Sequence, residues 1–341
     1  MIDLHTHLGG AVPASVLWEI LCDNGLQTEF QTFDHLQEYL TVNRGDIKNL
    51  DDFLTLYFHA TELIQSSPHA ASVATYQAVA KAYRRAEIAG IELRFNPLKR
   101  LRKGQYSLDA IILAAIQGLQ RASMHYKVRT GIIFSLGKDV SIKDNWQIIE
   151  AAIRFRSYGV LHGAYGVVGI DMAGPESSGH DTDISWLKEI AIMVEEARKV
   201  KLGVTWHVGE TTHSGPKGIE SVLNIIHPDR IGHGIQIRRA KGKQKERLLG
   251  ILKERQICFE LCPTVNLVTR SIRSFSEIAQ VVRMLDKEGI PYCLNTDNPY
   301  IVHTNLKKEY DVIKKELGAS FELEKKAGRY CAAATFLKNV N

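Results

Sequence analysis

The stretch Gly90-Ile91-Glu92-Leu93-Arg94-Phe95 begins a regular alternation of short apolar segments and amphipathic windows that continues almost to the end of the chain. Short segments rich in Ile, Val, Leu and Phe indicate strands, and apolar residues repeated at helical spacing between them indicate helices. From this stretch onward, strands are predicted at 91–95, 128–135, 167–172, 203–207, 230–231, 257–261 and 291–294.

One more strand is predicted near the start of the chain, in Asp3-Leu4-His5-Thr6-His7-Leu8. Nearly continuous apolar strands that alternate with helices are typical of parallel strands buried on both faces. Eight strand-helix units are the number that closes a barrel. The sequence therefore predicts an α/β fold, a (β/α)8 TIM barrel, with extra helices inserted after the first strand.

The region between the first two strands is longer than an ordinary connection. Within it, helices are expected at 13–22, 50–64 and 70–89. We interpret residues 12–89 as a helical insertion over the barrel mouth. Because no linker rich in Pro, Gly or Ser interrupts the chain, residues 1–341 are expected to form a single domain.

Composition restricts the class of protein. The chain has 341 residues, 45% hydrophobic and 24% charged, which is ordinary for a globular protein with a large core. A net charge of +5 is small for this length and gives no reason to expect nucleic acid as a partner. We find no apolar run of bilayer length and no basic, apolar leader, so a cytoplasmic protein without a membrane partner is expected. The five cysteines are expected to be buried, reduced thiols.

Two histidines on the first strand are candidate metal ligands. His5 and His7 are two residues apart, so their side chains point to the same face of a strand. Alone, the pair is weak evidence for a metal site, because a surface strand can carry two such histidines without binding a metal. Further polar residues follow predicted strands five, six and eight: His207, Glu210, His233 and Asp297. Active sites of such barrels lie at the carboxyl ends of the strands, which is where all of these residues fall.

The residue types suit hydrolysis at a metal. Three histidines and one aspartate converging on one ion suit zinc, with a water completing the shell. Glu210 is placed to act as a general acid, and His233 could orient or deprotonate the attacking water. Taken singly, Glu210 could instead be a solvated loop acid, and His233 a histidine with its hydrogen bonds satisfied in a turn.

Six motifs, in order along nearly the whole chain, resemble those of the adenosine/AMP deaminase family within the amidohydrolase superfamily. They are His5-Thr6-His7-Leu8-Gly9-Gly10-Ala11, Ile170-Asp171-Met172-Ala173-Gly174-Pro175-Glu176, Trp206-His207-Val208-Gly209-Glu210, Arg230-Ile231-Gly232-His233-Gly234, Phe259-Glu260-Leu261-Cys262-Pro263 and Asn295-Thr296-Asp297-Asn298-Pro299. The His-x-Gly-Glu, Gly-His-Gly and Thr-Asp motifs together are highly specific.

The resemblance implies a zinc-dependent hydrolase that deaminates a 6-aminopurine nucleoside, either adenosine or a 5′-modified or phosphorylated derivative. The products would be a 6-oxo, inosine-type purine and ammonia. One Zn²⁺ per chain would be held by His5, His7, His207 and Asp297. The partner would then be a small-molecule aminopurine, whereas the oligomeric state is not indicated.

The resemblance also implies catalytic and substrate-binding roles. Glu210 would donate a proton to N1 of the purine, and His233 with Asp297 would fix or activate the nucleophile. The backbone N–H of Gly174 would contact N3. Phe53 and Tyr57 match positions that line the hydrophobic pocket in relatives, although ordinary core residues would show the same pattern.

The chain departs from the family pattern at two positions. Asn298 stands where the family usually has an aspartate that donates to N7, and its amide NH₂ could still donate. Gly9 stands where adenosine deaminases commonly have an acid that binds the 5′ end of the ribose. Its small size is expected to leave space for a larger or anionic 5′ group.

A basic run follows the second strand and is expected near the same rim. Its members are Lys99, Arg100, Arg102 and Lys103. Such a run is commonly a solvated loop, and the alternative is a site that binds a phosphate or carboxylate on the substrate.

Other functions remain open at this stage. An amidohydrolase acting on another C–N or ester bond would keep the barrel and metal, but Glu210 at its spacing from His207 and the lack of an obvious bridging lysine disfavour it. A different aminopurine, such as aminodeoxyfutalosine, cyclic AMP or free adenine, is an alternative substrate. A non-catalytic binding protein is disfavoured because every candidate ligand and acid is present. The signature of nucleic-acid deaminases is missing.

Overall fold

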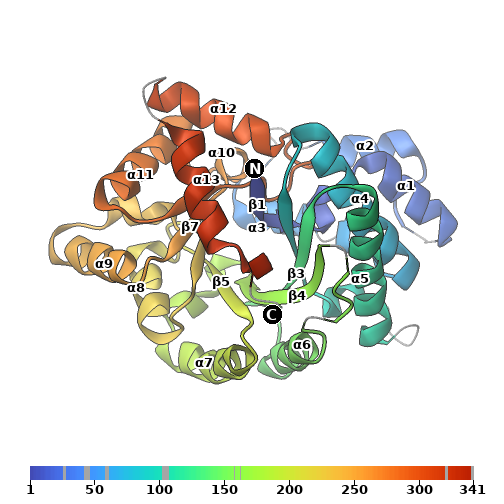
Figure 1. The fold of residues 1–341 in the computed structure, drawn as a ribbon, viewed down its shortest axis with the longest axis horizontal. Helices are drawn as coiled ribbons and strands as arrows, with labels where there is room; N and C mark the ends of the chain where they lie inside the picture. Colours follow the sequence, from blue (N-terminus) through green and yellow to red (C-terminus); the bar gives the residue numbers. More distant parts are fainter. Residues whose placement is uncertain are drawn as a thin grey trace.

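Eight parallel strands follow one another in sequence order in the computed structural model, and helices surround them (Figure 1). The structure describes residues 1–25, 28–41, 47–57, 61–101, 107–156, 158–161, 163–318 and 322–338. The strands are β1 Ile2–His7, β2 Gly90–Phe95, β3 Arg129–Gly137, β4 Ala164–Ala173, β5 Gly203–Val208, β6 Arg230–His233, β7 Cys258–Leu261 and β8 Tyr292–Leu294. The predicted (β/α)8 TIM barrel is confirmed.

The ring closes between the first strand and the residues just after the last. The His7 N–H donates to the Asp297 carbonyl at 2.8 Å, and the Asp297 N–H donates to the His5 carbonyl at the same distance. These bonds continue the parallel ladder from β8 back to β1, so that the two ends of the sheet meet.

The helices largely follow the predicted spacing. They are α1 Ala14–Asp23, α2 Phe33–Leu40, α3 Leu50–Tyr57, α4 Pro68–Ala86, α5 Leu108–His125, α6 Ile142–Arg154, α7 Ile184–Lys199, α8 Gly215–Ile225, α9 Gly242–Glu254, α10 Pro263–Val268, α11 Phe275–Glu288, α12 Leu306–Leu317 and α13 Leu323–Ala334.

The helix expected over 70–89 spans Pro68–Ala86 and ends at Glu87, whose backbone is left-handed. Helix α6 begins at Ile142, because the Ser141 side chain accepts a hydrogen bond from the Asp144 N–H and caps it. Of the helix expected over 50–64, α3 comprises Leu50–Tyr57 and residues 61–62 are again helical, whereas residues 58–60 lie outside the described part of the chain.

The helical region after β1 divides between two places. Helix α4 packs against α5 in the outer ring, as expected of the helix between β1 and β2 (Figure 1). Helix α3 lies at the carboxyl end of the barrel, where Leu54 and Tyr57 line a cavity together with His7.

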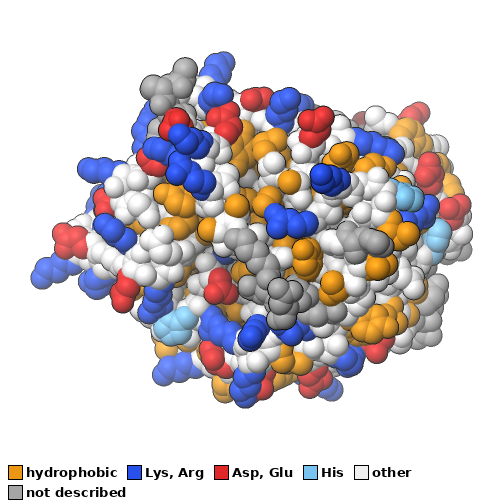
Figure 2. All heavy atoms as spheres, viewed as in Figure 1, with side chains coloured by type: hydrophobic (Ala, Val, Ile, Leu, Met, Phe, Trp, Pro, Cys, Tyr) orange, Lys and Arg blue, Asp and Glu red, His pale blue; other side chains and the backbone are white. Residues whose placement is uncertain are grey.

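Charges of both signs are interspersed over the face of the molecule shown in Figure 2, which looks onto the barrel from the side of the N-terminus. None of the described helices combines the length and apolar character that a bilayer crossing requires. Four cysteines are buried thiols as expected, whereas Cys22 is exposed.

Candidate metal centre and active site

Four side chains predicted as metal ligands lie together at the carboxyl end of the barrel. His5 and His7 end β1, His207 is near the end of β5, and Asp297 follows β8. The Nε2 atoms of His7 and His207 are 3.2 Å apart. Asp297 places Oδ1 3.6 Å from His7 Nε2 and Oδ2 3.9 Å from His5 Nε2. The structure thus brings the four residues of the predicted set around one point.

Buried carboxylates orient two of these histidines. His5 Nδ1 lies 2.7 Å from Glu260 Oε2, and His207 Nδ1 lies 3.0 Å from Asp171 Oδ1. A carboxylate can only accept a hydrogen bond, so the Nδ1 atoms of His5 and His207 carry the hydrogen. Their Nε2 atoms therefore present lone pairs to the centre. Arg94 holds both carboxylates, at 2.9 Å from Glu260 and 3.3 Å from Asp171.

The pKa shifts at the centre favour the protonation states in which these side chains can bind a metal ion. Burial, with the charge of Arg94 and the neighbouring imidazoles, holds the pKa of His5 well below its ordinary value. Burial likewise lowers the pKa of His7, so both rings are neutral. For Asp171, burial alone would raise the pKa, but His207 and Arg94 hold it below its ordinary value, and the carboxylate stays charged.

These residues fit a zinc ion. His5 Nε2 is fully buried and has no hydrogen-bond partner among the described residues. In a tetrahedral site with Zn–N distances of about 2.0–2.1 Å, two ligand nitrogens lie roughly 3.3 Å apart, close to the His7–His207 separation. Neutral imidazole nitrogens and a carboxylate are ligands that zinc accepts.

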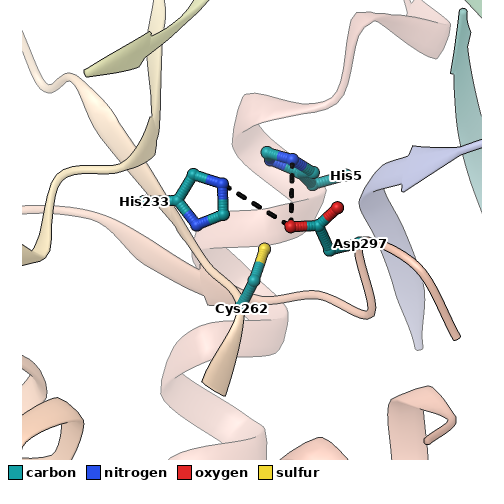
Figure 3. Close-up of side chains that lie close together, drawn as sticks. All are labelled: His5, His233, Cys262 and Asp297. Carbon is teal, nitrogen blue, oxygen red and sulfur yellow. Dashed lines mark ion pairs between the residues drawn. The ribbon is translucent and has the colours of Figure 1, made fainter. Parts of the chain in front are cut away.

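A second group of possible ligands shares the same centre. His5, His233, Cys262 and Asp297 each offer an atom within 4.8 Å of the others, and all four are buried. Figure 3 shows the His233 ring and the Cys262 sulfur directed toward the Asp297 carboxylate. The sequence interpretation treated Cys262 only as a buried thiol. Its proximity to the centre becomes visible once β7 is placed beside β8.

Glu210 lies within reach of this centre and is held from both sides. Its Oε2 is 3.6 Å from His233 Nε2, which is itself 3.6 Å from Asp297 Oδ2. The Asn266 side-chain amide donates to Glu210 Oε1 at 3.2 Å. Glu176 fixes the loop, because Oε1 accepts the Glu210 backbone N–H at 2.9 Å.

The surroundings of Glu210 keep its carboxyl protonated. Burial raises the pKa of Glu210 well above its ordinary value, and the charges of Asp297 and Glu176 raise it further. A carboxylic acid that stays neutral near pH 7 can donate a proton to a bound molecule. Burial also lowers the pKa of His233 well below its ordinary value, so the ring is neutral, and its Nδ1 accepts a hydrogen bond from the Asn266 amide at 3.1 Å.

Two adjoining cavities lie over the centre. The inner one, about 50 Å³, is lined by His7, Glu210, His233 and Asp297, with Phe53 of α3 in its wall. The outer one is about 690 Å³. Tyr57 and Gly174 line both, so the two cavities adjoin each other. Gly174 has φ +113°, a backbone conformation that favours glycine.

Asn298 is directed differently from the expectation. Its side-chain amide donates to Asp297 Oδ1, so the NH₂ group is engaged by the carboxylate. The side chain packs over Gly10, where an added Cβ would lie 2.2 Å from Asn298 Oδ1. Asn298 lines the inner cavity, but its donor is directed at the metal-centre carboxylate.

The expected free space at Gly9 is filled, so that prediction is wrong. A Cβ built on Gly9 would lie 2.3 Å from Tyr57 Oη and 2.7 Å from Thr61 Oγ1. The inserted region therefore occupies the volume that the small residue leaves.

The residues of the basic run differ in their surroundings. Arg100 is fully buried, and its Nη1 donates to Gln65 Oε1 at 2.8 Å, so it is part of the core. Lys99 lines the outer cavity but pairs with Asp139 at 2.7 Å. Arg102 and Lys103 lie outside the described residues.

Several residues around the centre were missed by the sequence interpretation. They are Arg94, Asp171, Glu176, Glu260 and Asn266. The available signal was a charge within an apolar strand, as for Asp171 in β4 and Glu260 in β7. Such residues are rarely buried unless paired, so they could have been recognised as members of an internal network.

Comparison with known proteins gives a consistent picture. The family model described as adenosine deaminase matches residues 1–339. The adenosine deaminase of Clostridium perfringens is 27% identical over 335 residues, covering 98% of this chain and 93% of the relative.

Solved structures share the fold. Adenine deaminase from Arthrobacter aurescens superposes with a TM-score of 0.82 at 17% identity, covering 98% of this chain and 93% of the other. The N6-mAMP deaminase of Arabidopsis superposes with a TM-score of 0.76 at 24% identity, covering 98% and 92%. At these identities the likeness concerns the fold alone.

Proposed function

The chain belongs to the adenosine deaminase family, hydrolases that act on C–N bonds of cyclic amidines, and on this premise we propose that it deaminates 6-aminopurine nucleosides with zinc. Water replaces the 6-amino group, which gives a 6-oxopurine and ammonia. The observation that carries the proposal is the buried Glu210, which lies 3.6 Å from His233 next to the candidate metal ligands. Burial raises the pKa of its carboxyl well above the ordinary value.

His5, His7, His207 and Asp297 would hold the zinc ion. The three histidines form one group of possible ligands, Asp297 lies within 3.9 Å of His5 and 3.6 Å of His7, and His5 Nε2 has no hydrogen-bond partner among the described residues. Bound there, zinc supplies a water whose pKa is lowered toward neutrality. His233 Nδ1 accepts a hydrogen bond from the Asn266 amide at 3.1 Å, so Nε2 carries the hydrogen. Between the carboxylates of Glu210 and Asp297, this N–H would donate a hydrogen bond to the attacking water and orient it.

Glu210 donates its proton to N1 of the purine as oxygen adds at C6. This transfer prevents negative charge from accumulating on the ring as its aromaticity is lost. The Gly174 N–H is proposed to contact N3, and Phe53 and Tyr57 to pack on the base. Asn298 is proposed to bind N7 only after it rotates away from Asp297, because its NH₂ group is engaged there.

We further propose that the chain is one domain in which α3, within the helical region 12–89, covers the barrel mouth, whereas α4 belongs to the outer ring. The position of α3 supports this, since Phe53 and Tyr57 reach from it into the cavity wall. The exclusion of bulk water by such a cover would strengthen the electrostatic effects within the site.

The test is a substrate panel with purified, zinc-loaded protein. Adenine, adenosine, deoxyadenosine, 5′-methylthioadenosine, AMP, cyclic AMP and aminodeoxyfutalosine are followed by loss of the aminopurine ultraviolet band and by ammonia release. Turnover of a nucleoside with stoichiometric ammonia is expected. Turnover of none of these compounds would refute the proposal.

A further inference from the structure

Glu62 is a buried acid in the wall of the outer cavity. Glu62 is 5% exposed, and it lines the cavity of about 690 Å³ that His7 and Gly174 also line. Because the outer cavity adjoins the inner one, a ligand with its base over the metal centre would direct its remaining atoms toward Glu62.

The turn that carries Glu62 is fixed in place. The Thr61 hydroxyl donates to the Tyr57 carbonyl at 2.5 Å, and the Gln65 side-chain amide donates to the Gly9 carbonyl at 3.2 Å. Arg100 Nη1 donates a hydrogen bond to Gln65 Oε1 at 2.8 Å. The turn is therefore tied to the residues directly after the candidate ligands of β1.

No partner within the described residues satisfies the Glu62 carboxyl through a hydrogen bond or an ion pair. Arg100 is close enough to lower the pKa of Glu62, but burial has the larger effect and raises it. A buried polar group without a partner is costly unless a ligand satisfies it. Glu62 borders the cavity, so a ligand there can supply the missing hydrogen bond.

The charges of the outer cavity decide which ligand suits it. Lys99, whose charge could attract an anion, is paired with Asp139 at 2.7 Å. Asp51 adds a further carboxylate to the same wall. The described lining residues include three carboxyl groups, those of Asp51, Glu62 and Asp139, against the single lysine Lys99. An anionic substituent would therefore meet more acidic than basic groups.

We propose that Glu62 recognises the sugar of the substrate by accepting a hydrogen bond from one of its hydroxyl groups, and that it disfavours 5′-phosphorylated substrates. This inference rests on the proposed function and narrows it to nucleosides with an uncharged sugar. A hydroxyl group satisfies the carboxylate without adding charge, whereas a phosphate contributes only acceptors and negative charge.

The test measures binding, so that it does not depend on turnover. Inosine, inosine 5′-monophosphate and hypoxanthine are titrated into zinc-loaded protein by calorimetry. The wild type is expected to bind inosine on the order of tenfold more tightly than its monophosphate. Glu62→Gln should bring the two affinities within about threefold and leave hypoxanthine binding unchanged.

Two further variants make the comparison specific. Glu38→Gln makes the same chemical change on the exposed side of α2 and should keep the wild-type ratio. Glu62→Asp keeps the charge but shortens the side chain, so it should still reject the monophosphate while it binds inosine more weakly. Circular dichroism melting establishes that each variant is folded.

Equal wild-type affinity for inosine and its monophosphate would overturn the assignment. So would a wild-type ratio retained in folded Glu62→Gln, or no binding of any of the three compounds. If the expected ratios are found but adenosine is not deaminated, the proposed function fails while the role of Glu62 in recognition stands.

Discussion

The backbone N–H of Asp297 donates a hydrogen bond to the carbonyl oxygen of His5 at 2.8 Å, and so joins two candidate metal ligands through the main chain. The same bond belongs to the seam that closes the barrel. The separation of these ligands is therefore set by the fold as well as by their side chains. Distortion of the seam is expected to affect the fold and metal affinity together.

Removal of the metal should abolish activity and lower the melting temperature, because a ligand bound only by the folded state stabilises it. Mass spectrometry of the purified protein should find one zinc per chain, and His5→Ala should lose it. His69→Ala, at an exposed histidine of α4, should keep the metal. Two ions per chain, or full activity after chelation, would contradict the single-site assignment.

Glu210→Gln should retain zinc and lose about 10²–10⁴-fold in kcat, because an amide cannot donate the proton that the carboxylic acid supplies. The measurement is steady-state deamination with metal content determined on the same sample. Glu220→Gln, at a carboxylate on α8 that pairs with Arg247, is the matched control. Unchanged turnover in Glu210→Gln would show that Glu210 is not the general acid.

Asp171→Asn should weaken zinc affinity by about 10–100-fold, because it disturbs the bond that fixes the orientation of His207. Competition with a chromophoric chelator measures the affinity. Asp109→Asn makes the same change in a surface pair with Arg154 and should have no effect. Wild-type affinity in Asp171→Asn would show that the carboxylate does not support the metal site.

Glu309 should make the folded state less stable as the pH rises toward neutrality. Burial raises its pKa to about 7, while hydrogen bonds from Thr264 and Thr304 partly oppose the shift. The folded state holds this proton more tightly than the unfolded chain, whose value is near 4.5. The contribution to stability is full below about pH 4.5 and is lost as the pH rises through 7.

Urea unfolding at pH 5 and pH 7.5 measures the effect. Between these values the free energy of unfolding should fall by roughly 2 kcal/mol more in the wild type than in Glu309→Gln. Glu38→Gln should retain the wild-type difference, since it alters an exposed carboxylate. Identical pH dependence in Glu309→Gln and the wild type would refute the assignment.

Gly9→Ala should destabilise the protein by about 1–3 kcal/mol, because the new methyl group would overlap Tyr57 and Thr61. Thermal melting measures the loss. Gly250→Ala is the control in helix α9, where an added Cβ meets nothing within 4 Å and should stabilise by about 0.5–1 kcal/mol. Equal behaviour of the two variants would mean that Tyr57 does not occupy the space over Gly9.

Much of the fold was predictable because each strand is a short apolar run between helical repeats. His5, His207 and Asp297 were predictable for a related reason: they end strands, and the barrel brings strand ends to one rim. The contact of Glu260 with His5 was not predictable from spacing alone, because it depends on how side chains cross the barrel interior. The filling of the space at Gly9 depends on the path of a long connection, which sequence periodicity does not determine.

The seam between β1 and the residues after β8 also sets an order of events during synthesis. His5 is synthesised before Asp297, and strands β2 to β8 lie between them in the chain. The proposed coordination sphere therefore cannot form until translation has passed Asp297, after all eight strands have been made.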